Sequence, residues 1–396
     1  MYSGVFPPDY NKYEAPTVKG KAAHVYFQMH VMDVDRIDEG LMEFSIQSYL
    51  SEVWEDKRLN LSIFLGNKEG NVVFPVVLSN YIWTPDLVFD NAKSGHLFDL
   101  SLPNKHLRVL RESVLLRSSR FSLVISCQMN FHHYPMDTQH CFLKIAFLSN
   151  PDHIVELHWS EEKEELHRKS GQSILLTNNI QPLKYELLPP TSYKTKEEWI
   201  AGNFTYLYAN FTFVRRISGS LLNVYVPSML VVFLSWISFW LDVAAVPARI
   251  TLGVTSLLTL ATQVVQAHNG LPPISYMTAM DIWLFACLIT VFGSLLEYAF
   301  AYQTYFAYKQ HTFVCPQRSD IPMVKVGENL NGIRTSSTEL SSRLLFRKPL
   351  KEIEHRLQNN KMKVKERTLD NLCRKLFPLA FTTFAVIYWT FYLLLK

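Results

Sequence analysis

Four long apolar runs constrain this chain more than any other feature, and all of them lie after residue 219. They cover residues 220–241, 250–267, 282–302 and 376–395. A helix needs roughly 20 apolar residues to cross the hydrocarbon core of a bilayer, and each run approaches or exceeds that length. A single run would also suit a buried helix of a soluble protein. Four runs, each flanked by charges, predict a membrane protein with four spanning helices.

The charge distribution predicts how these helices are oriented. Residues 303–375 hold 15 Lys and Arg against 7 Asp and Glu, a net charge of +8, whereas residues 1–219 hold 22 against 25, a net charge of −3. Because basic loops stay in the cytoplasm, we expect both chain termini to be extracellular in a multi-pass protein of the cell membrane. The predicted parts are an extracellular domain (1–219), three spanning helices (220–302), a cytoplasmic loop with a basic helix (303–375) and a fourth spanning helix (376–396).

The N-terminal segment has the pattern of an all-β domain. Short stretches of alternating apolar and polar residues, separated by turn formers, predict an immunoglobulin-like sandwich over residues 21–219. Three glycosylation sequons fall in this segment, at Asn60, Asn203 and Asn210, which agrees with an extracellular location. The first 20 residues lack the apolar core of a signal peptide, so we expect the chain to be mature or trimmed.

Cysteines and catalytic motifs narrow the function further. Cys127 and Cys141 form an even pair in the predicted extracellular part, which makes them a disulfide candidate. The sequence has no Gly-rich phosphate loop, nucleophile elbow or zinc-ligand spacing, so we do not expect an enzyme or an organic cofactor.

The second apolar run carries a polar stripe. Its members recur at helical spacing and therefore share one face of a helix; they are Thr251, Thr255, Leu258 and Thr262. A helix surrounded by lipid has no use for such hydroxyl groups, whereas a helix that lines a water-filled pore does. With Arg249 at the start of the helix, the pattern predicts an ion channel with a cationic mouth.

Four motifs make the chain resemble the Cys-loop receptors, which are pentameric ligand-gated ion channels, from about residue 22 onward. Thirteen residues separate Cys127 from Cys141, with Tyr134-Pro135-Met136-Asp137 at their centre. The other three motifs are Trp83-Thr-Pro-Asp86, Trp236-Ile-Ser-Phe-Trp240 and Pro247-Ala248-Arg249.

The Pro247-Ala248-Arg249 motif resembles the anion-selective branch of the family, which includes glycine-, GABA-, glutamate-, histamine- and pH-gated chloride channel subunits. The resemblance implies four further subunits as partners, chloride as the permeant ion, a small-molecule or ionic agonist, and membrane lipid, with no nucleic acid. Five copies of Arg249 would ring the cytoplasmic mouth and attract chloride. Five copies of Leu258 would form a hydrophobic constriction that closes the pore by dewetting.

The resemblance also implies an agonist site between subunits. Four residues match positions that contact agonists in the family, Tyr49, Arg120, Trp199 and Phe204, and Phe89 lies next to a further such position. Other positions depart from the family pattern, because aromatic, glutamate or arginine residues are replaced by Ser51, Val88, Ala146 and Leu148. The aromatic box is therefore incomplete, and the sequence does not identify the agonist.

Residues that couple ligand binding to the pore are implied in the same way. The family pattern assigns this role to Tyr134, Pro135 and Asp137 in the loop between the cysteines. Asp137 is predicted to pair with Arg215 or Arg216, which precede the first spanning helix. The linker that starts at Leu271 and Pro272 is expected to lie beneath the disulfide-closed loop.

Two alternatives stay open. The N-terminal segment is rich in histidine, and histidine both titrates near neutrality and binds zinc. Together with the incomplete aromatic box, this suggests protons or zinc as the stimulus, with His106, Glu197 and Glu198 near the expected cleft. The second alternative is a non-conducting accessory subunit, against which the intact stripe argues.

Overall fold

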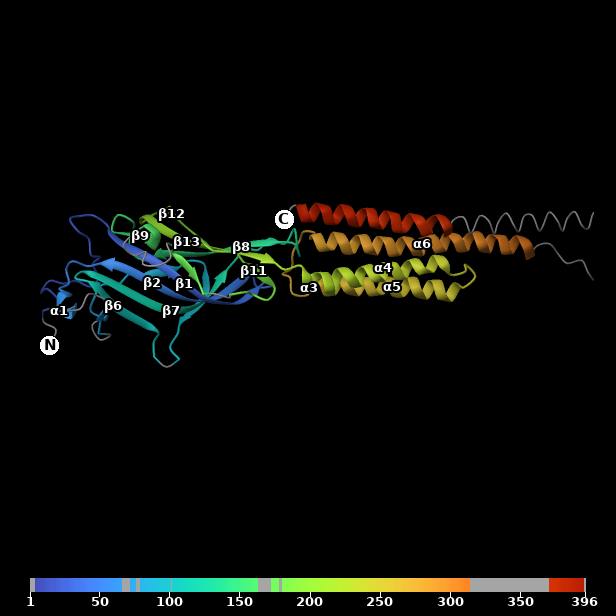
Figure 1. Cartoon of the computed structure of the whole chain (residues 1–396). Helices are drawn as coiled ribbons and strands as arrows, with labels where there is room; N and C mark the ends of the chain where they lie inside the picture. The colour runs from blue at the N-terminus through green and yellow to red at the C-terminus, as the bar shows by residue number, and fades with distance from the viewer. Residues whose placement is uncertain are drawn as a thin grey trace, which may run out of the picture. The chain divides into compact units, whose positions relative to one another are not determined.

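The computed structural model describes residues 4–65, 72–75, 79–100, 102–162, 172–177, 180–313 and 370–394 (Figure 1). The chain divides into two compact units. The first comprises Met1–Gly219 with Gly270–Ala279, and the second comprises Ser220–Asn269 with Met280–Lys396. Most of the predicted cytoplasmic loop and its basic helix, at residues 314–369, lie outside the described residues.

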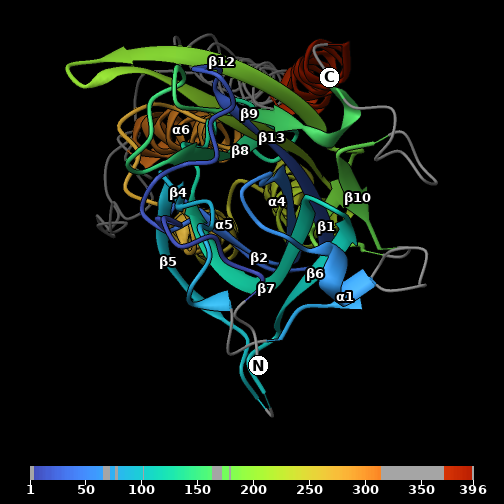
Figure 2. The ribbon, with the colours of Figure 1, turned by 90° about the vertical axis from the view of Figure 1, so that its left-hand side faces the viewer.

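The first unit is a sandwich of two β-sheets, which confirms the predicted fold (Figure 2). The larger sheet has the order β10-β1-β2-β7-β6-β3, with β5 paired to β7 and β9 paired to β1. Its strands are β1 (Ala23–Asp38), β2 (Glu43–Glu55), β3 (Val72–Val73), β5 (Ala92–Leu97), β6 (Lys105–Arg111), β7 (Val114–Ser126), β9 (Val155–Trp159) and β10 (Ile174–Leu176).

The smaller sheet has the order β11-β13-β8-β4, with β12 paired to β13. Its strands are β4 (Leu87–Phe89), β8 (Thr138–Phe147), β11 (Tyr185–Leu187), β12 (Thr191–Trp199) and β13 (Gly202–Arg215). A short helix, α1 (Ser62–Leu65), and a 3₁₀ turn, η1 (Ser160–Glu162), also belong to this unit.

Alternating side chains build the core between the sheets. On β1, every second residue from Val25 to Val31 is buried, as expected for a strand with one face on a core. Phe44 of β2 reaches across to Phe211 and Phe213 of β13, with ring centroids 5.6 Å apart in both pairs. The apolar residues that recur at every second position of the sequence therefore form the interior of the sandwich.

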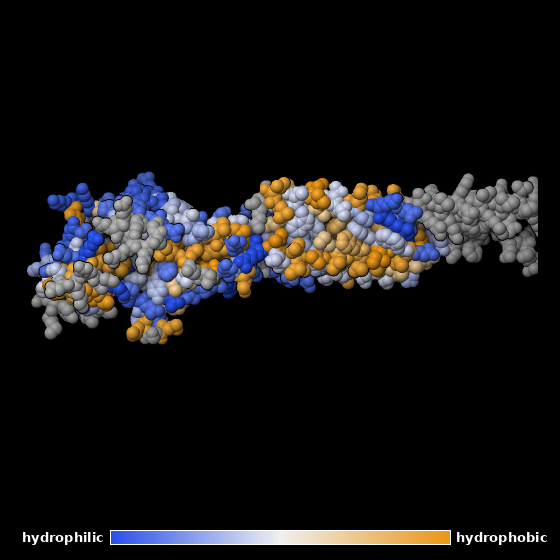
Figure 3. Space-filling model, viewed as in Figure 1, coloured by the Kyte–Doolittle hydropathy of each residue, from blue (hydrophilic) through white to orange (hydrophobic). Residues whose placement is uncertain are grey.

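The second unit contains four helices long and apolar enough to cross a membrane, as predicted. They span Ser218–Trp240, Val246–His268, Ala279–Phe306 and Asp370–Leu394. The first consists of α3 (Ser218–Ser220), η3 (Leu221–Tyr225), α4 (Val226–Trp236) and η4 (Ile237–Trp240); the second is α5 (Val246–His268), and the third lies in α6 (Ala279–Phe313). Apolar side chains cover much of the visible face of these helices (Figure 3).

Aromatic packing holds the helices together. Trp283 of α6 is fully buried, and its ring contacts Tyr225, Phe381 and Tyr388, with centroids 5.2–5.7 Å apart. Its Nε1–H donates a 2.9 Å hydrogen bond to Ser228 Oγ, so the one polar atom of the indole is satisfied. The Asp370–Leu394 helix therefore packs onto the first and third helices of this unit.

Candidate functional site

The polar stripe of α5 lies on the face that its own unit leaves unpacked. Its four members are exposed, and Leu258 has 63% of its surface accessible. The buried residues of α5 are Arg249, Gly253, Ser256, Leu260 and Ala267. At 100° per residue these two sets lie on opposite sides of the helix. The structure thus leaves the predicted pore-lining face free of intrasubunit packing.

The hydroxyl groups of the stripe bond to their own helix. Thr251 Oγ donates to the carbonyl of Pro247 at 2.7 Å, Thr255 Oγ to that of Thr251 at 2.7 Å, and Thr262 Oγ to that of Thr259 at 2.8 Å. These bonds satisfy each donor locally while the hydroxyl oxygen stays on the surface. The stripe is therefore polar without requiring a partner on another helix.

A glycine allows α5 to approach α6 closely. A Cβ added to Gly253 would lie 2.2 Å from Leu295 Cδ2 and 2.8 Å from its Cγ. Both distances are far below a van der Waals contact, so a larger residue here would require the Leu295 side chain or one of the helices to shift. This close contact lies on the side of α5 opposite the stripe.

Arg249 lies on the buried face of α5 and not beside the exposed stripe, where the sequence predicts the pore. Its side chain is 0% exposed, and Nη2 donates to Asp370 Oδ2 at 3.0 Å. Its Nε donates to the Leu241 carbonyl at 3.1 Å. The physical reason is helical geometry, because a residue two positions before Thr251 lies about 200° around the helix from it.

The first turn of α5 presents its backbone instead. Pro247 and Ala248 are exposed there, and the turn holds no acidic residue. The N-terminus of a helix carries a partial positive charge from its unpaired N–H groups. This end of the helix therefore favours anions, although the guanidinium of Arg249 is turned inward.

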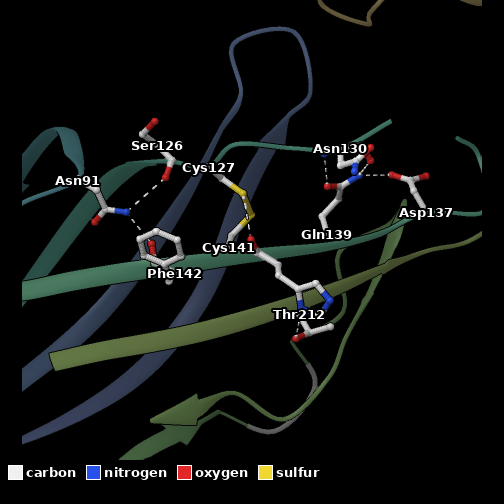
Figure 4. The surroundings of a disulfide bond; sticks show 10 residues. Asn91, Ser126, Cys127, Asn130, Asp137, Gln139, Cys141, Phe142 and Thr212 are labelled. Atoms are coloured by element: carbon white, nitrogen blue, oxygen red, sulfur yellow. Dashed lines mark hydrogen bonds between the residues drawn. A yellow bond between two sulfur atoms is a disulfide. The ribbon is translucent and has the colours of Figure 1, made fainter. Parts of the chain in front are cut away.

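The cysteine-closed loop is confirmed in the first unit. Cys127 and Cys141 form a disulfide bond, and Gln139 braces the loop from within (Figure 4). Gln139 Nε2 donates to the Asn130 carbonyl at 2.7 Å and to Asp137 Oδ2 at 2.5 Å. The backbone N–H of Asn130 donates in return to Gln139 Oε1 at 2.9 Å. The loop is thus closed by a disulfide bond and by internal hydrogen bonds.

Asp137 pairs with Arg215 rather than Arg216, and the pair is buried. Arg215 Nε and Nη2 donate to the two carboxylate oxygens of Asp137 at 2.7 and 3.2 Å, and Nη1 donates to Glu39 Oε1 at 2.8 Å. Arg216 is exposed and contacts Gln181 instead. The predicted pair is therefore part of a buried network in which Arg215 contacts two carboxylates, those of Asp137 and Glu39.

Aromatic rings and hydrogen bonds stabilise the charges of this network. The guanidinium of Arg215 lies 4.7 Å from the Tyr134 ring and 4.6 Å from the Tyr185 ring. Tyr185 also donates its hydroxyl to Glu39 Oε1 at 3.1 Å. Burial is the largest single influence and would raise the pKa of Glu39. The hydrogen bond from Arg215, a backbone hydrogen bond and the charges of Arg215 and Lys184 together lower the pKa below its usual value.

The linker that begins at Leu271 and Pro272 packs against the disulfide-closed loop, as predicted. Pro272 is buried, and Leu271 contacts the apolar core of the sandwich. Further along the linker, the Tyr276 ring stacks on His132 at 4.0 Å, and its hydroxyl accepts a 3.1 Å hydrogen bond from the Phe131 backbone. Pro135 is buried in the same loop, joined to Tyr134 by a cis peptide bond.

The residues that match agonist-contacting positions fall into two sets. Tyr49 on β2 and Arg120 on β7 are direct partners in the larger sheet, and the guanidinium lies 5.9 Å from the Tyr49 ring and 4.1 Å from the Phe98 ring. Trp199 and Phe204 lie at the β12–β13 hairpin of the smaller sheet, where Trp199 is exposed. Phe89 on β4 packs on Phe121 at 5.6 Å. The pair Tyr49 and Arg120 therefore lies on one sheet of the chain, and the pair Trp199 and Phe204 lies on the other.

A lysine that sequence reasoning missed lies near the β12–β13 hairpin. Lys144 Nζ is 4.1 Å from the Tyr206 ring and pairs with Asp90 and Glu197, both at 3.1 Å. Burial lowers the pKa of Lys144, but hydrogen bonds to these carboxylates raise it more, so the net shift is upward. The alternating pattern of its strand predicts that Lys144 is a surface residue and gives no sign that an aromatic ring and two carboxylates surround its ammonium group.

The larger sheet borders a cavity of about 400 Å³. Ionisable residues that line it include Glu52, Arg117, Lys105 and His106. Arg117 Nε donates to Glu52 Oε2 at 2.7 Å, yet full burial raises the pKa of Glu52 to about 7. Burial and the nearby Arg108 lower the pKa of His106. The cavity therefore holds a carboxyl group that titrates near neutrality.

The other predicted positions are placed as follows. Among the described residues, His106, Glu197 and Glu198 do not form a cluster of close metal-ligand atoms. Of the sequon residues, Asn60 and Asn203 are exposed and Asn210 is half-buried. His167, one of the histidines of the N-terminal segment, lies outside the described residues.

The chain combines a β-sandwich that carries a disulfide-closed loop with four apolar helices, the second of which has an unpacked polar face. This combination is typical of channel subunits that have a folded ligand-binding domain. The family model of the neurotransmitter-gated ion-channel ligand binding domain matches residues 3–217, and that of the neurotransmitter-gated ion-channel transmembrane region matches residues 224–343. The chain therefore belongs to the neurotransmitter-gated ion-channel family, which consists of channels and not enzymes.

Individual relatives agree with this assignment. A protein named glutamate-gated chloride channel, from Drosophila melanogaster, is 34% identical over 277 residues, which cover 70% of this chain and 58% of the relative. Gamma-aminobutyric acid receptor subunit rho-2 is 34% identical in Bos taurus and 35% in Homo sapiens, over 284 residues that cover 72% of this chain and 59% of each relative. The chain thus spans somewhat under three fifths of the length of these relatives.

Proposed function

We propose that this chain is a subunit of a pentameric chloride channel of the cell membrane, opened by an extracellular ligand. The observation that carries the proposal is the hydroxyl stripe of α5, which is exposed although three other apolar helices are available to cover it. Five such faces around a common axis would line a water-filled path, with Leu258 as its apolar constriction.

Anion selectivity is supported by two observations. The relatives include a protein named as a chloride channel. The first turn of α5 exposes Pro247 and Ala248 and carries no acidic residue, so its positive end would meet the permeant ion.

The arrangement of the agonist-contact residues supports a site shared by two subunits. Tyr49 and Arg120 lie on one sheet, and Trp199 and Phe204 lie on the other. A site between two copies would combine Tyr49 and Arg120 of one copy with Trp199 and Phe204 of its neighbour. The chemistry of the ligand stays open, because the aromatic box is incomplete.

The test is the reversal potential of the membrane current in cells that express this chain alone. We expect it to follow external chloride by about 58 mV per tenfold change, since ΔG = zFψ for a monovalent ion. Glycine, GABA, glutamate, histamine, serotonin, zinc and pH steps would be applied in turn. A current that ignores the chloride gradient would refute the proposal, and absence of any current would favour an accessory subunit.

Leu258→Thr tests the constriction without knowledge of the ligand. A hydroxyl in the narrowest ring would keep it hydrated, so we expect a standing chloride current without agonist. Ile250→Thr, a like change on α5 away from the stripe, is the control and should stay closed at rest. Equal resting currents in the two variants would contradict a pore lined by the Thr251–Thr262 face.

A second candidate stimulus, extracellular protons, is favoured by the buried Glu52 in its cavity. Because the pKa of Glu52 is near 7, mild acidification would neutralise it and release Arg117. The charge balance of the cavity wall would then change within the physiological pH range.

Glu52→Gln should remove a component of the pH dependence of stability. A pKa raised from 4.5 to about 7 means that the folded state binds this proton more tightly than the unfolded chain. Its contribution is therefore fully present below about pH 4.5 and is lost as the pH rises through 7. We expect the wild type to lose thermal stability relative to Glu52→Gln between pH 5 and 8.

The control is Glu55→Gln, which alters a half-exposed carboxylate on the same strand. Glu55→Gln should follow the wild-type pH profile, and currents evoked by pH steps should be lost in Glu52→Gln alone. Wild-type pH responses in Glu52→Gln would exclude Glu52 as the proton sensor.

A further inference from the structure

A cluster of ionisable side chains lies apart from these sites, where β9 pairs with β1. His24 on β1 is directly opposite Glu156 on β9, and His158 follows Glu156 by two residues. Residues two apart on a strand share a face of the sheet, so all three side chains project from the same side. Among the residues that the structure describes, this is a group whose three ligand atoms lie within 4.8 Å of one another.

The distances within the cluster suit a tetrahedral metal ion. His24 Nδ1 is 3.0 Å from His158 Nε2, His158 Nε2 is 3.5 Å from Glu156 Oε2, and His24 Nδ1 is 3.9 Å from Glu156 Oε2. Ligand atoms bound to zinc at about 2.0–2.2 Å lie roughly 3.3–3.6 Å apart in a tetrahedron. Shifts of roughly half an ångström would therefore complete three corners of the tetrahedron.

A second carboxylate lies against the other ring nitrogen of His158. His158 Nδ1 is 2.7 Å from Glu162 Oε2, and a proton on Nδ1 would be donated to this carboxylate, which would leave the lone pair of Nε2 directed toward the cluster. The Tyr26 ring stacks on His158 at 5.3 Å and holds its orientation.

Charge and access are also compatible with an ion. The side chain of His24 is 51% exposed, against 22% for Glu156 and 12% for His158, so the cluster opens to solvent on the His24 side. Lys196 pairs with Glu156 Oε1 at 3.3 Å, while Oε2 of the same carboxylate lies nearest the histidines. Lys194 is 2.6 Å from Glu162 Oε2 and 3.1 Å from His158 Nδ1, on the side away from the cluster.

We propose that His24, Glu156 and His158 bind one divalent transition-metal ion of the zinc class per subunit, with water in the fourth position. Two imidazoles and a carboxylate favour zinc over the hard ions calcium and magnesium. The site differs in every residue from the earlier candidate set of His106, Glu197 and Glu198. Lys194 and Lys196 lie on β12, the strand that ends at Trp199, so an ion here would act on charges that hold the predicted ligand-binding hairpin.

The test is metal binding by the purified full-length chain in detergent, with zinc titrated calorimetrically and Co²⁺ used as a spectroscopic probe. We expect one zinc ion per chain at this site and the intense visible bands of tetrahedral Co²⁺. His158→Gln should abolish both signals, and His24→Gln should weaken zinc binding at least tenfold. Glu162→Gln leaves every ligand in place and should weaken binding about 10–100-fold, because it acts through the tautomer of His158.

His96→Gln is the matched control, since His96 is an exposed histidine on another strand of the same sheet. It should bind zinc and Co²⁺ as the wild type does. His24 is largely exposed, so His24→Gln should fold even if His158→Gln does not. In that case the zinc affinity of His24→Gln is the measurement that tests the proposed site. Zinc affinity and Co²⁺ spectra in His24→Gln equal to those of the wild type would overturn the proposal.

Discussion

Replacing Arg215 with glutamine is expected to destabilise the sandwich unit by about 3–5 kcal/mol, the usual cost of removing one partner from a buried ion pair. The variant removes the buried cation that Asp137 and Glu39 share and leaves Glu39 only the more distant, exposed Lys184 at 3.8 Å. It also removes the cation that lies between the Tyr134 and Tyr185 rings. Thermal unfolding of the purified protein measures the loss, and surface expression reports it in cells.

Lys57→Gln is the control for this experiment, because it removes a half-exposed pair with Glu55 on the same unit. Exposed pairs contribute little, so its unfolding temperature should match that of the wild type. Asp137→Asn keeps the shape of the side chain but removes its charge, and should fall between the two. A wild-type unfolding temperature for Arg215→Gln would show that the network is not a stabilising element.

Replacing Arg249 with glutamine is expected to cost the helical unit a similar amount, about 3–5 kcal/mol. Asp370, which is buried, would lose its cation, and the Leu241 carbonyl would lose a donor. The expected result is loss of folded protein at the cell surface and a lower unfolding temperature in detergent. This outcome follows from the inward position of Arg249; an arginine in the pore wall would give a folded protein with altered selectivity instead.

The double variant Arg249→Met/Asp370→Leu separates charge from packing. Replacing a whole buried ion pair by apolar residues is often neutral or stabilising, so this variant should regain the stability that Arg249→Gln loses. Lys375→Gln, with an exposed side chain on the same helix as Asp370, serves as the unperturbed control. Normal stability and surface expression of Arg249→Gln, with changed ion selectivity, would restore the pore-facing interpretation.

Local patterns in the sequence predicted the elements of this fold. Alternation on strands such as β1 and the length of the apolar runs depend only on neighbouring residues, so the sandwich and the four helices could be read directly. The exposed stripe of α5 was predicted for the same reason, and the Cys127–Cys141 bond was predicted from the even pair of cysteines in the extracellular part. The inward position of Arg249 was also available from the helical period, through its two-residue offset from Thr251.

The partners of the charged residues were decided by tertiary structure. Arg249 meets Asp370 across 121 positions, Arg215 meets Glu39 across 176, and His24 meets His158 across 134. Helical or strand periodicity states which face a side chain occupies but not which element covers that face. Sheet register and helix packing make that choice, because they bring together groups whose separation along the chain carries no local signal. The sequence by itself therefore determined what this protein is built from, and its tertiary structure determined which charges are buried and which residues gather as candidate sites.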